Sequence, residues 1–264
     1  MEYLHGGRQN QISRSGKVVY RPAGRWSKSV HLLLEHVRDN GFCAVPEPLG
    51  FDGQGNEILT YLPGEVSNYP LSQAAASLEA LETAAGLLRR YHDATASFLD
   101  SGTGDLQWML PPVEPAEVIC HGDYAPYNVV LDGCTAVAII DFDTAHPGPR
   151  VWDVAYALYR WAPLKNPANP DSLGDLESQI QRARRFCDLY GLSEADRRNI
   201  VDVAVRRLGT LLDFMHAQAA QGSETFLSHL ADGHHLSYLN DMKYMQRYWK
   251  RIVQGLVHPS KPMG

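Results

Sequence analysis

Hydrophobic and polar positions alternate in short runs over the first sixty residues of the chain. Gln11 to Ser13 and Lys17 to Arg21 alternate on either side of a glycine, which predicts a β-hairpin. From Ser27 to about Asn40 the apolar residues recur at helical spacing, and a glycine follows where the helix would end. Glu57 to Leu62 reads as a further strand, closed by the turn Pro63-Gly64. These residues therefore predict strands around one helix.

The pattern becomes mostly helical beyond that turn. Ala74 to Phe98 is rich in Ala and Leu at helical spacing, and helical periodicity returns from Val151 almost to the end. Between these stretches lie three short apolar runs, Val118 to Cys120, Val129 to Leu131 and Ala136 to Ile140. The sequence therefore predicts a small β-rich N-terminal lobe over residues 1–63 and a larger helical C-terminal lobe over residues 64–264.

The composition is that of an ordinary globular protein, with 44% hydrophobic and 20% charged residues. No apolar run approaches the ~18 residues that span a bilayer, and the N-terminus lacks the basic start and apolar core of a signal peptide. The four cysteines are scattered without paired spacing. We therefore expect reduced, buried thiols, a cytoplasmic protein and no membrane partner.

The net charge of −6 is concentrated in the middle of the chain. Residues 64–132 carry two Lys/Arg against ten Asp/Glu, whereas the segments on either side are nearly balanced. No segment has the basic excess of a nucleic-acid footprint, so a nucleic-acid partner is not expected. The acidic segment has two interpretations, a surface that attracts cations or a set of solvated loop and helix faces.

The densest polar chemistry follows the three apolar runs. Asp123 and Asn128 are five positions apart on a loop, because a proline lies between them. Asp141 and Asp143 are two positions apart, so they would face the same side of an extended chain. Carboxylate and amide oxygens are hard ligands that suit Mg²⁺. Two alternatives are polar turn residues without a ligand, and a metal-dependent hydrolase that also uses His121.

This segment resembles a known enzyme family. H-x-D-x-x-x-x-N from His121 to Asn128, followed by D-F-D from Asp141 to Asp143, resembles the catalytic core of the aminoglycoside phosphotransferase and choline kinase family, relatives of protein kinases. The resemblance covers most of the chain but is specific only between His121 and Asp153. At the position of Asp153 the family has an aspartate that braces the catalytic loop. It implies an α+β, bilobal protein-kinase-like fold with the active site between the lobes, and ATP and Mg²⁺ as cofactors.

The resemblance also implies roles for individual residues. Asp123 would orient the attacking hydroxyl and accept its proton, and His121 would order the catalytic loop. Asn128 and Asp141 would hold Mg²⁺ against the triphosphate, and Asp143 would contact a second metal. Such catalysis consists mostly of positioning and charge neutralisation, so it needs no covalent intermediate.

The N-terminal lobe matches the family less closely. Gly6, Gly7 and Asn10 resemble the start of its phosphate-covering loop, with an ordinary turn as the alternative. The strand that would carry the phosphate-binding lysine carries Arg21 instead, and Arg and Lys are not interchangeable. Glu35 in the following helix is the expected carboxylate partner, with an ordinary exposed glutamate as the alternative.

We therefore predict an enzyme that moves the ATP γ-phosphate to a hydroxyl of a small molecule. The acceptor would be an antibiotic such as an aminoglycoside, which would suit the acidic segment, or a metabolite such as an amino alcohol or sugar. The alternative is a catalytically weak, nucleotide-binding pseudokinase, because of Arg21 and the short glycine pair. Four C-terminal histidines suggest either a transition-metal site or ordinary loop histidines: His216, His229, His234 and His235.

Overall fold

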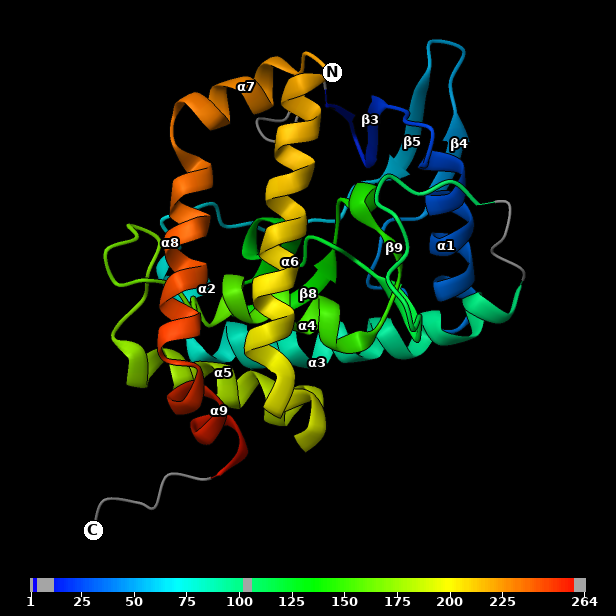
Figure 1. Ribbon diagram of the computed structural model, residues 1–264. Helices are drawn as coiled ribbons and strands as arrows, with labels where there is room; N and C mark the ends of the chain where they lie inside the picture. The colour runs from blue at the N-terminus through cyan, green and yellow to red at the C-terminus, as the bar shows by residue number, and fades with distance from the viewer. Residues whose placement is uncertain (1, 4–11, 102–105, 259–264) are drawn as a thin grey trace.

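The computed structural model describes residues 2–3, 12–101 and 106–258 of the chain. Its N-terminal part is a five-stranded antiparallel sheet in the order β1-β2-β3-β5-β4 (Figure 1). The strands are β1 (Glu2–Tyr3), β2 (Ser13–Ser15), β3 (Val18–Pro22), β4 (Pro48–Phe51) and β5 (Asn56–Thr60). The predicted hairpin is confirmed, since β2 and β3 pair antiparallel, although β2 begins at Ser13 rather than ending there.

Helix α1 (Ser27–Asp39) packs against β4 and against the helical part of the molecule. At its first residue, the Ser27 Oγ accepts a hydrogen bond from the Gly24 amide at 3.0 Å. One face of the helix is apolar and buried, formed by Val30, Leu33, Leu34 and Val37. Gly41 follows with a φ of 83°, a left-handed conformation that suits glycine and ends the helix.

The remainder of the described chain is mainly helical. Its longer helices are α3 (Leu78–Thr95), α4 (Arg150–Trp161), α5 (Leu176–Tyr190), α6 (Glu194–Ala220), α7 (Glu224–Ala231), α8 (His234–Arg247) and α9 (Trp249–Val257). In Figure 1, α3 and α5 run side by side and α6 stands across them, packed on α4, α8 and α9. The buried residues of these helices continue the core that begins in α1.

The predicted helix from Ala74 to Phe98 is divided into three parts. They are α2 (Gln73–Ala76), α3 and a 3-10 helix, η1 (Ala96–Ser101). The break occurs at Ser77, whose backbone is extended with ψ at 158° and whose side chain accepts from the Ala80 amide at 3.1 Å. Helical periodicity continues through the break, so the pattern alone did not reveal this N-cap.

Two short ladders position the polar segments. Strand β6 (Val118–Cys120) pairs with β9 (His146–Gly148), and β7 (Val129–Asp132) pairs with β8 (Thr135–Ile139), both antiparallel. The connection after β6 contains the 3-10 helix η3 (Pro126–Asn128), and the one after β8 contains η4 (Phe142–Thr144). The three predicted apolar runs are therefore strands, and the polar residues lie in the turns that follow them.

The linking segment after Gly64 is bonded to the larger part of the molecule. Glu65 exchanges two backbone hydrogen bonds with Leu131 of β7, at 3.0 and 2.7 Å. The lobe boundary at residue 63 stays a prediction from the sequence.

All four cysteines are free thiols. Cys120 and Cys187 are buried as expected, but Cys134 is only partly buried and Cys43 is exposed. Among the described helices, none combines the length and the hydrophobicity needed to cross a membrane.

Candidate active site

The polar loop begins where β6 ends. Gly122 has a φ of 81°, and a Cβ at this position would overlap the carbonyl oxygen of Thr144. Glycine is therefore required for the loop to approach the segment after β8 so closely. The Thr144 hydroxyl also donates to the His121 carbonyl at 3.1 Å, which joins the two segments directly.

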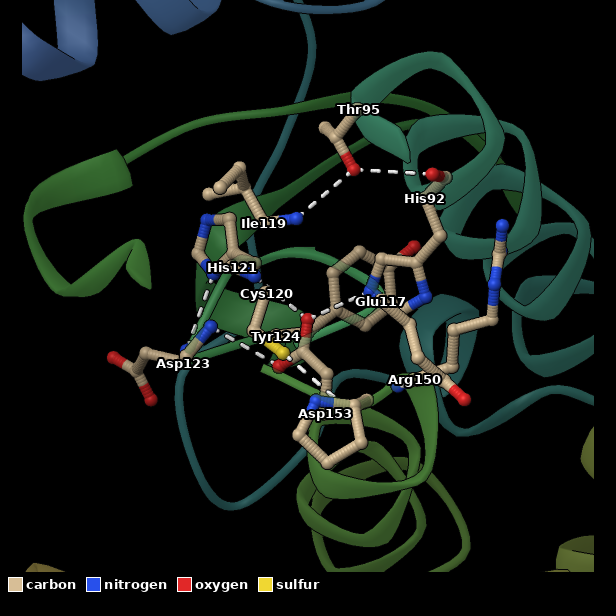
Figure 2. Close-up of polar contacts among 12 residues, drawn as sticks. His92, Thr95, Glu117, Ile119, Cys120, His121, Asp123, Tyr124, Arg150 and Asp153 are labelled. Carbon is tan, nitrogen blue, oxygen red and sulfur yellow. Dashed lines mark hydrogen bonds and ion pairs between the residues drawn. The ribbon is translucent and has the colours of Figure 1, made fainter. Parts of the chain in front are cut away.

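Asp153 lies beneath this loop, near the start of α4 (Figure 2). Its Oδ2 accepts from the His121 amide at 2.7 Å, and its Oδ1 accepts from the Gly122 amide at 3.0 Å. Its side chain is fully buried, and burial alone would raise its pKa. Hydrogen bonds from the His92 ring and the His121 amide instead lower the pKa of Asp153 to about 2. Asp153 is thus an ionised brace for the loop.

His92 of α3 supplies the third donor to Asp153. Burial lowers the pKa of His92 below its ordinary value in spite of the neighbouring carboxylate, so the ring is neutral at pH 7. Its Nε2 then donates to Asp153 Oδ2 at 3.0 Å, and its Nδ1 accepts from the Tyr190 hydroxyl at 2.6 Å. The contact between His92 and Asp153 is therefore a hydrogen bond to a charged acceptor rather than an ion pair.

His121 is buried and has both ring nitrogens engaged. Its Nε2 donates to the Ile140 carbonyl at 2.9 Å, and its Nδ1 accepts from the Asp123 amide at 3.2 Å. The ring thus ties the loop after β6 to the end of β8. This geometry leaves no nitrogen to bind a metal, which contradicts the hydrolase alternative.

Asp123 and Asn128 lie at opposite ends of one turn and contact each other. The Asn128 Nδ2 donates to the Asp123 backbone carbonyl and to its Oδ2, both at 3.0 Å. The Tyr127 hydroxyl donates to Asp123 Oδ1 at 2.7 Å. Burial raises the pKa of Tyr127 well above its ordinary value, so this hydroxyl keeps its proton. The Asp123 carboxylate is therefore held in one orientation by two neutral donors.

Asp141 and Asp143 follow β8 in a turn rather than in an extended chain. Asp141 has a φ of 62°, which is left-handed and unusual for a residue other than glycine. Both carboxylates nevertheless reach one cation, the guanidinium of Arg21, which donates to Asp141 at 2.8 Å and also to Asp143. The Trp26 indole donates to Asp143 at 2.9 Å. Burial raises the pKa of Asp143 despite the adjacent arginine.

Arg21 also pairs with Glu57, its cross-strand partner between β3 and β5. The Arg21 Nε donates to Glu57 Oε1 at 2.7 Å, and His31 Nε2 lies 3.0 Å from Glu57 Oε2. Burial opposes the charge on Arg21, but its three carboxylate neighbours raise its pKa above the ordinary value. The expected partner Glu35 is instead exposed on α1, so the sequence assigned this carboxylate to the wrong residue.

The acidic residues after β8 fit a divalent cation by donor chemistry and by position. Two carboxylates already flank a single positive charge, and the Asn128 amide oxygen can add a third hard ligand. Within the described ranges, no three or more His, Cys, Asp or Glu residues gather as a metal site. The C-terminal histidines, which are all among the described residues, therefore do not form such a site either. A cation at Asp141 and Asp143 would therefore take its remaining ligands from phosphate and water.

A cavity of about 190 Å³ opens beside Asp123. It lies between the turn Asp123 to Asn128 and the helices α4, α6, α7 and α8, which contribute most of its walls. Asp123 and Tyr127 lie in its lining together with Arg160 and Arg207. An acceptor in this cavity would have direct access to the Asp123 carboxylate.

Several of these residues gave no signal in the sequence. Arg160 lies in the last turn of α4 and Arg207 in the middle of α6, and they come together only in the folded chain. Glu57 could have been found from opposite charge across two strands, but only if the strand register had been known. The predicted phosphate-loop residues Gly6, Gly7 and Asn10 lie outside the described residues.

Comparison with known proteins relates this site to phosphotransferases. The sequence profile of the phosphotransferase enzyme family matches residues 104–190. The trifolitoxin immunity protein of Rhizobium leguminosarum bv. trifolii is 35% identical over 206 residues, which are 75% of this chain and 77% of that protein.

Solved structures agree with the predicted fold. A choline/ethanolamine kinase family protein from Mesorhizobium loti superposes with a TM-score of 0.60 at 15% identity, covering 93% of this chain and 88% of that one. An amicoumacin kinase in complex with AMP-PNP and Ca²⁺ gives 0.56 at 13% identity, covering 98% and 93%. The predicted α+β, bilobal, protein-kinase-like fold is confirmed.

Proposed function

Because this chain belongs to the phosphotransferase enzyme family, we propose that it moves the γ-phosphate of ATP onto a hydroxyl of a small molecule. One observation carries this proposal. A single turn places Asp123 at a cavity, and at its end the Asn128 carbonyl accepts from the amide of Ile140, directly before the acidic pair, so an acceptor and a metal-bound nucleotide could meet there. Phosphoryl transfer needs little beyond such positioning and charge neutralisation.

In this reaction Asp123 orients the acceptor hydroxyl and takes its proton as the phosphoryl group is transferred. Tyr127 and Asn128 hold the carboxylate through hydrogen bonds at 2.7 and 3.0 Å, which fixes its direction. His121 and Asp153 act indirectly, since one ties the loop to Ile140 and the other binds the loop amides. The proton would leave to solvent with the product.

Mg²⁺ would be held by Asn128, Asp141 and Asp143, and would neutralise charge on the transferred phosphate. Arg21 would turn its fork towards the phosphate oxygens of the nucleotide. Gly6, Gly7 and Asn10 would cover those phosphates, as predicted from the sequence. Nucleotide and divalent-cation use is supported by the amicoumacin kinase of the same fold, which was solved with AMP-PNP and Ca²⁺.

The biological role we propose is inactivation of a toxic compound by phosphorylation. Its support is the relative at 35% identity, which is a trifolitoxin immunity protein. The N-terminal lobe, residues 1–63, would bind the nucleotide, and residues 64–264 would carry the catalytic loop and the acceptor. A cytoplasmic location would suit an enzyme that uses ATP. It would also suit a chain whose cysteines are not spaced in pairs.

The proposal is tested with γ-labelled ATP and a panel of neutral, cationic and anionic hydroxyl compounds that includes sugars, amino alcohols, aminoglycosides, hydroxy acids and hydroxyalkyl phosphates. We expect label transfer to at least one acceptor that requires a divalent cation and is lost in Asp123→Asn. If ATP binds with Mg²⁺ but no label leaves it in any mixture, including water, the chain is not an active phosphotransferase.

That outcome would favour a second candidate, a nucleotide-binding pseudokinase. The observation in its favour is Arg21, whose guanidinium bridges both carboxylates that would ligate the metal. If the guanidinium stays between these carboxylates, no metal ion would bind there to assist phosphoryl transfer from the bound nucleotide. Nucleotide binding that is unchanged by chelation of divalent cations would identify this case.

A further inference from the structure

The cavity beside Asp123 contains two buried arginines. Arg160 of α4 is 8% exposed and Arg207 of α6 is 4% exposed, and both line the cavity. In the part of the chain that the structure describes, neither lies within ion-pair distance of a carboxylate. Burying an uncompensated charge is costly, so such arginines call for a ligand or an unusual environment.

Arg207 is incompletely hydrogen-bonded within the protein. One guanidinium nitrogen donates to the Gly122 carbonyl, directly before Asp123. Its Nε is buried and has no hydrogen-bond partner. Its guanidinium carbon lies 4.5 Å from the centre of the Tyr156 ring, which faces the same cavity. An unsatisfied buried donor at the edge of a cavity is the feature expected of a ligand-binding group.

Arg160 approaches the same tyrosine. It donates to the Tyr156 hydroxyl at 2.9 and 2.8 Å and to the Tyr238 hydroxyl at 3.0 Å, and lies 5.1 Å from the Tyr156 ring centre. Burial raises the pKa of Tyr156 above its ordinary value, so the phenol is neutral and does not compensate the charge. Two guanidinium groups therefore converge on one ring, stabilised by π-electrons, hydroxyls and the Gly122 carbonyl rather than by a carboxylate.

The remaining charged and titratable groups of the lining leave it positive. Asp123 is its one carboxylate among the described residues, and the rim adds His229 and His234, which can only add positive charge. Apart from Asp123, the acidic residues that the structure describes in the 64–132 segment do not line the cavity; Glu82, for example, pairs with Arg185, and Asp93 pairs with Arg89. The expectation that this segment would prepare the site for a polycation is therefore not supported by the cavity.

The size of the cavity also limits its occupant. At about 190 Å³ it is smaller than the ~300 to 1,000 Å³ clefts that bind drug-sized ligands. This suits a compact group with one hydroxyl and one short charged arm, either a small molecule or one part of a larger compound.

We propose that this cavity binds an acceptor that carries an anionic group next to its hydroxyl, held by Arg160 and Arg207, and not a cationic amino alcohol or aminoglycoside. This inference rests on the proposed phosphotransferase function. The guanidinium forks match the two oxygens of a carboxylate or the oxygens of a phosphate. With the anion bound there, the hydroxyl of the same molecule would be directed towards Asp123, which lines the same cavity.

Four alcohols of similar length test the charge preference directly: γ-hydroxybutyrate, hydroxypropyl phosphate, butanediol and aminobutanol. Binding is measured by ligand-observed NMR at millimolar concentration and constant ionic strength, without turnover. We expect γ-hydroxybutyrate or hydroxypropyl phosphate to bind at least about tenfold more tightly than the neutral and cationic members, and their ratio distinguishes carboxylate from phosphate. Equal or tighter binding of aminobutanol, or binding of none of the four, overturns the inference.

Variants locate the effect within the cavity. Arg160→Met and Arg207→Met should each weaken binding of the preferred anion at least about tenfold, with ATP affinity unchanged. The exposed neighbour Arg206→Met removes the same charge on α6 and should have no such effect. Equal losses in Arg206→Met, or a loss of ATP binding instead of anion binding, contradict the assignment. Because ATP binding is followed separately, failure of this inference is distinguishable from failure of the phosphotransferase function.

Discussion

The guanidinium of Arg21 on β3 donates to Asp141 Oδ1 at 2.8 Å, a contact that joins positions 120 residues apart in the chain. It connects the N-terminal sheet to the turn after β8 where we propose that the metal binds. A cation therefore already lies between Asp141 and Asp143. Metal-bound nucleotide and Arg21 would compete for these carboxylates unless the arginine moves to the phosphates.

We predict that Arg21→Ala raises the apparent KM for ATP at least tenfold, a loss of ~1.4 kcal/mol or more, because one fork to the phosphates is removed. Arg21→Lys should recover only part of this, since one ammonium cannot reproduce two parallel donors. Steady-state kinetics at saturating acceptor measure both effects. Lys28→Ala, which removes an exposed charge from α1, serves as the control. An unchanged apparent KM for ATP in Arg21→Ala would mean that another cationic side chain binds the phosphates.

The same variant should strengthen metal binding, although it weakens nucleotide binding. Without nucleotide, Arg21→Ala frees Asp141 and Asp143 from their guanidinium partner, so Mn²⁺ should bind more tightly than to the wild type. Electron paramagnetic resonance of free Mn²⁺ during titration measures this affinity. Weaker or equal Mn²⁺ binding would mean that the two carboxylates do not form the cation site.

Asp123→Ala should lower turnover at least ~10²-fold, the usual scale for a general base, with little change in nucleotide affinity. The expectation follows from the position of its carboxylate at the cavity, held by Tyr127 and Asn128. Single-turnover kinetics and nucleotide titration separate the two quantities. Asp132→Asn, an exposed carboxylate at the end of β7, is the matched control. Near-normal turnover of Asp123→Ala would remove the central assignment.

Asp141→Ala should weaken Mg²⁺-dependent ATP binding and abolish transfer, because it removes a hard oxygen ligand from the proposed metal site. Isothermal titration with Mg²⁺ and with chelator gives the metal-dependent part of the affinity. Asp202→Ala, which removes an exposed carboxylate from α6, controls for the change in net charge. Identical titrations for Asp141→Ala and wild type would contradict the metal role.

The sequence predicted the parts of the site that follow from local order. Asp123 and Asn128 share one turn, and Asp141 and Asp143 share the next, so their spacing alone brought each pair together. The neighbouring apolar runs are strands for the same reason, since periodicity and turn residues are local properties. The family resemblance then predicted the α+β fold and its two lobes, which the structural comparisons confirm.

The sequence could not predict contacts that depend on strand register or helix packing. Glu57 rather than Glu35 faces Arg21 because β3 and β5 pair in one particular register. Arg160 and Arg207 meet at Tyr156 only because α4 packs on α6. The charge of the cavity beside Asp123 therefore could not be predicted from the acidic composition of the 64–132 segment.

The contribution of the Asp153 carboxylate to the stability of the fold should depend on pH. Its carboxylate accepts from the amides of His121 and Gly122 and from the neutral ring of His92. Asp153→Asn replaces one acceptor oxygen with a donor that would face these groups. We expect the free energy of unfolding at pH 7 to fall by ~3 to 5 kcal/mol, as for other broken buried charge contacts, and turnover to fall with it.

The pH dependence follows from the sign of the pKa shift. The pKa of Asp153 is lowered from 3.8 to about 2 in the folded chain, so its stabilising effect is fully present above about pH 4 and is lost as the pH falls towards 2. The difference in unfolding free energy between wild type and Asp153→Asn should therefore narrow over this window. Urea denaturation of both proteins at several pH values measures it, and Asp202→Asn should show no such narrowing. A difference that stays constant from pH 7 to 2 would mean that Asp153 is not ionised where it braces the loop.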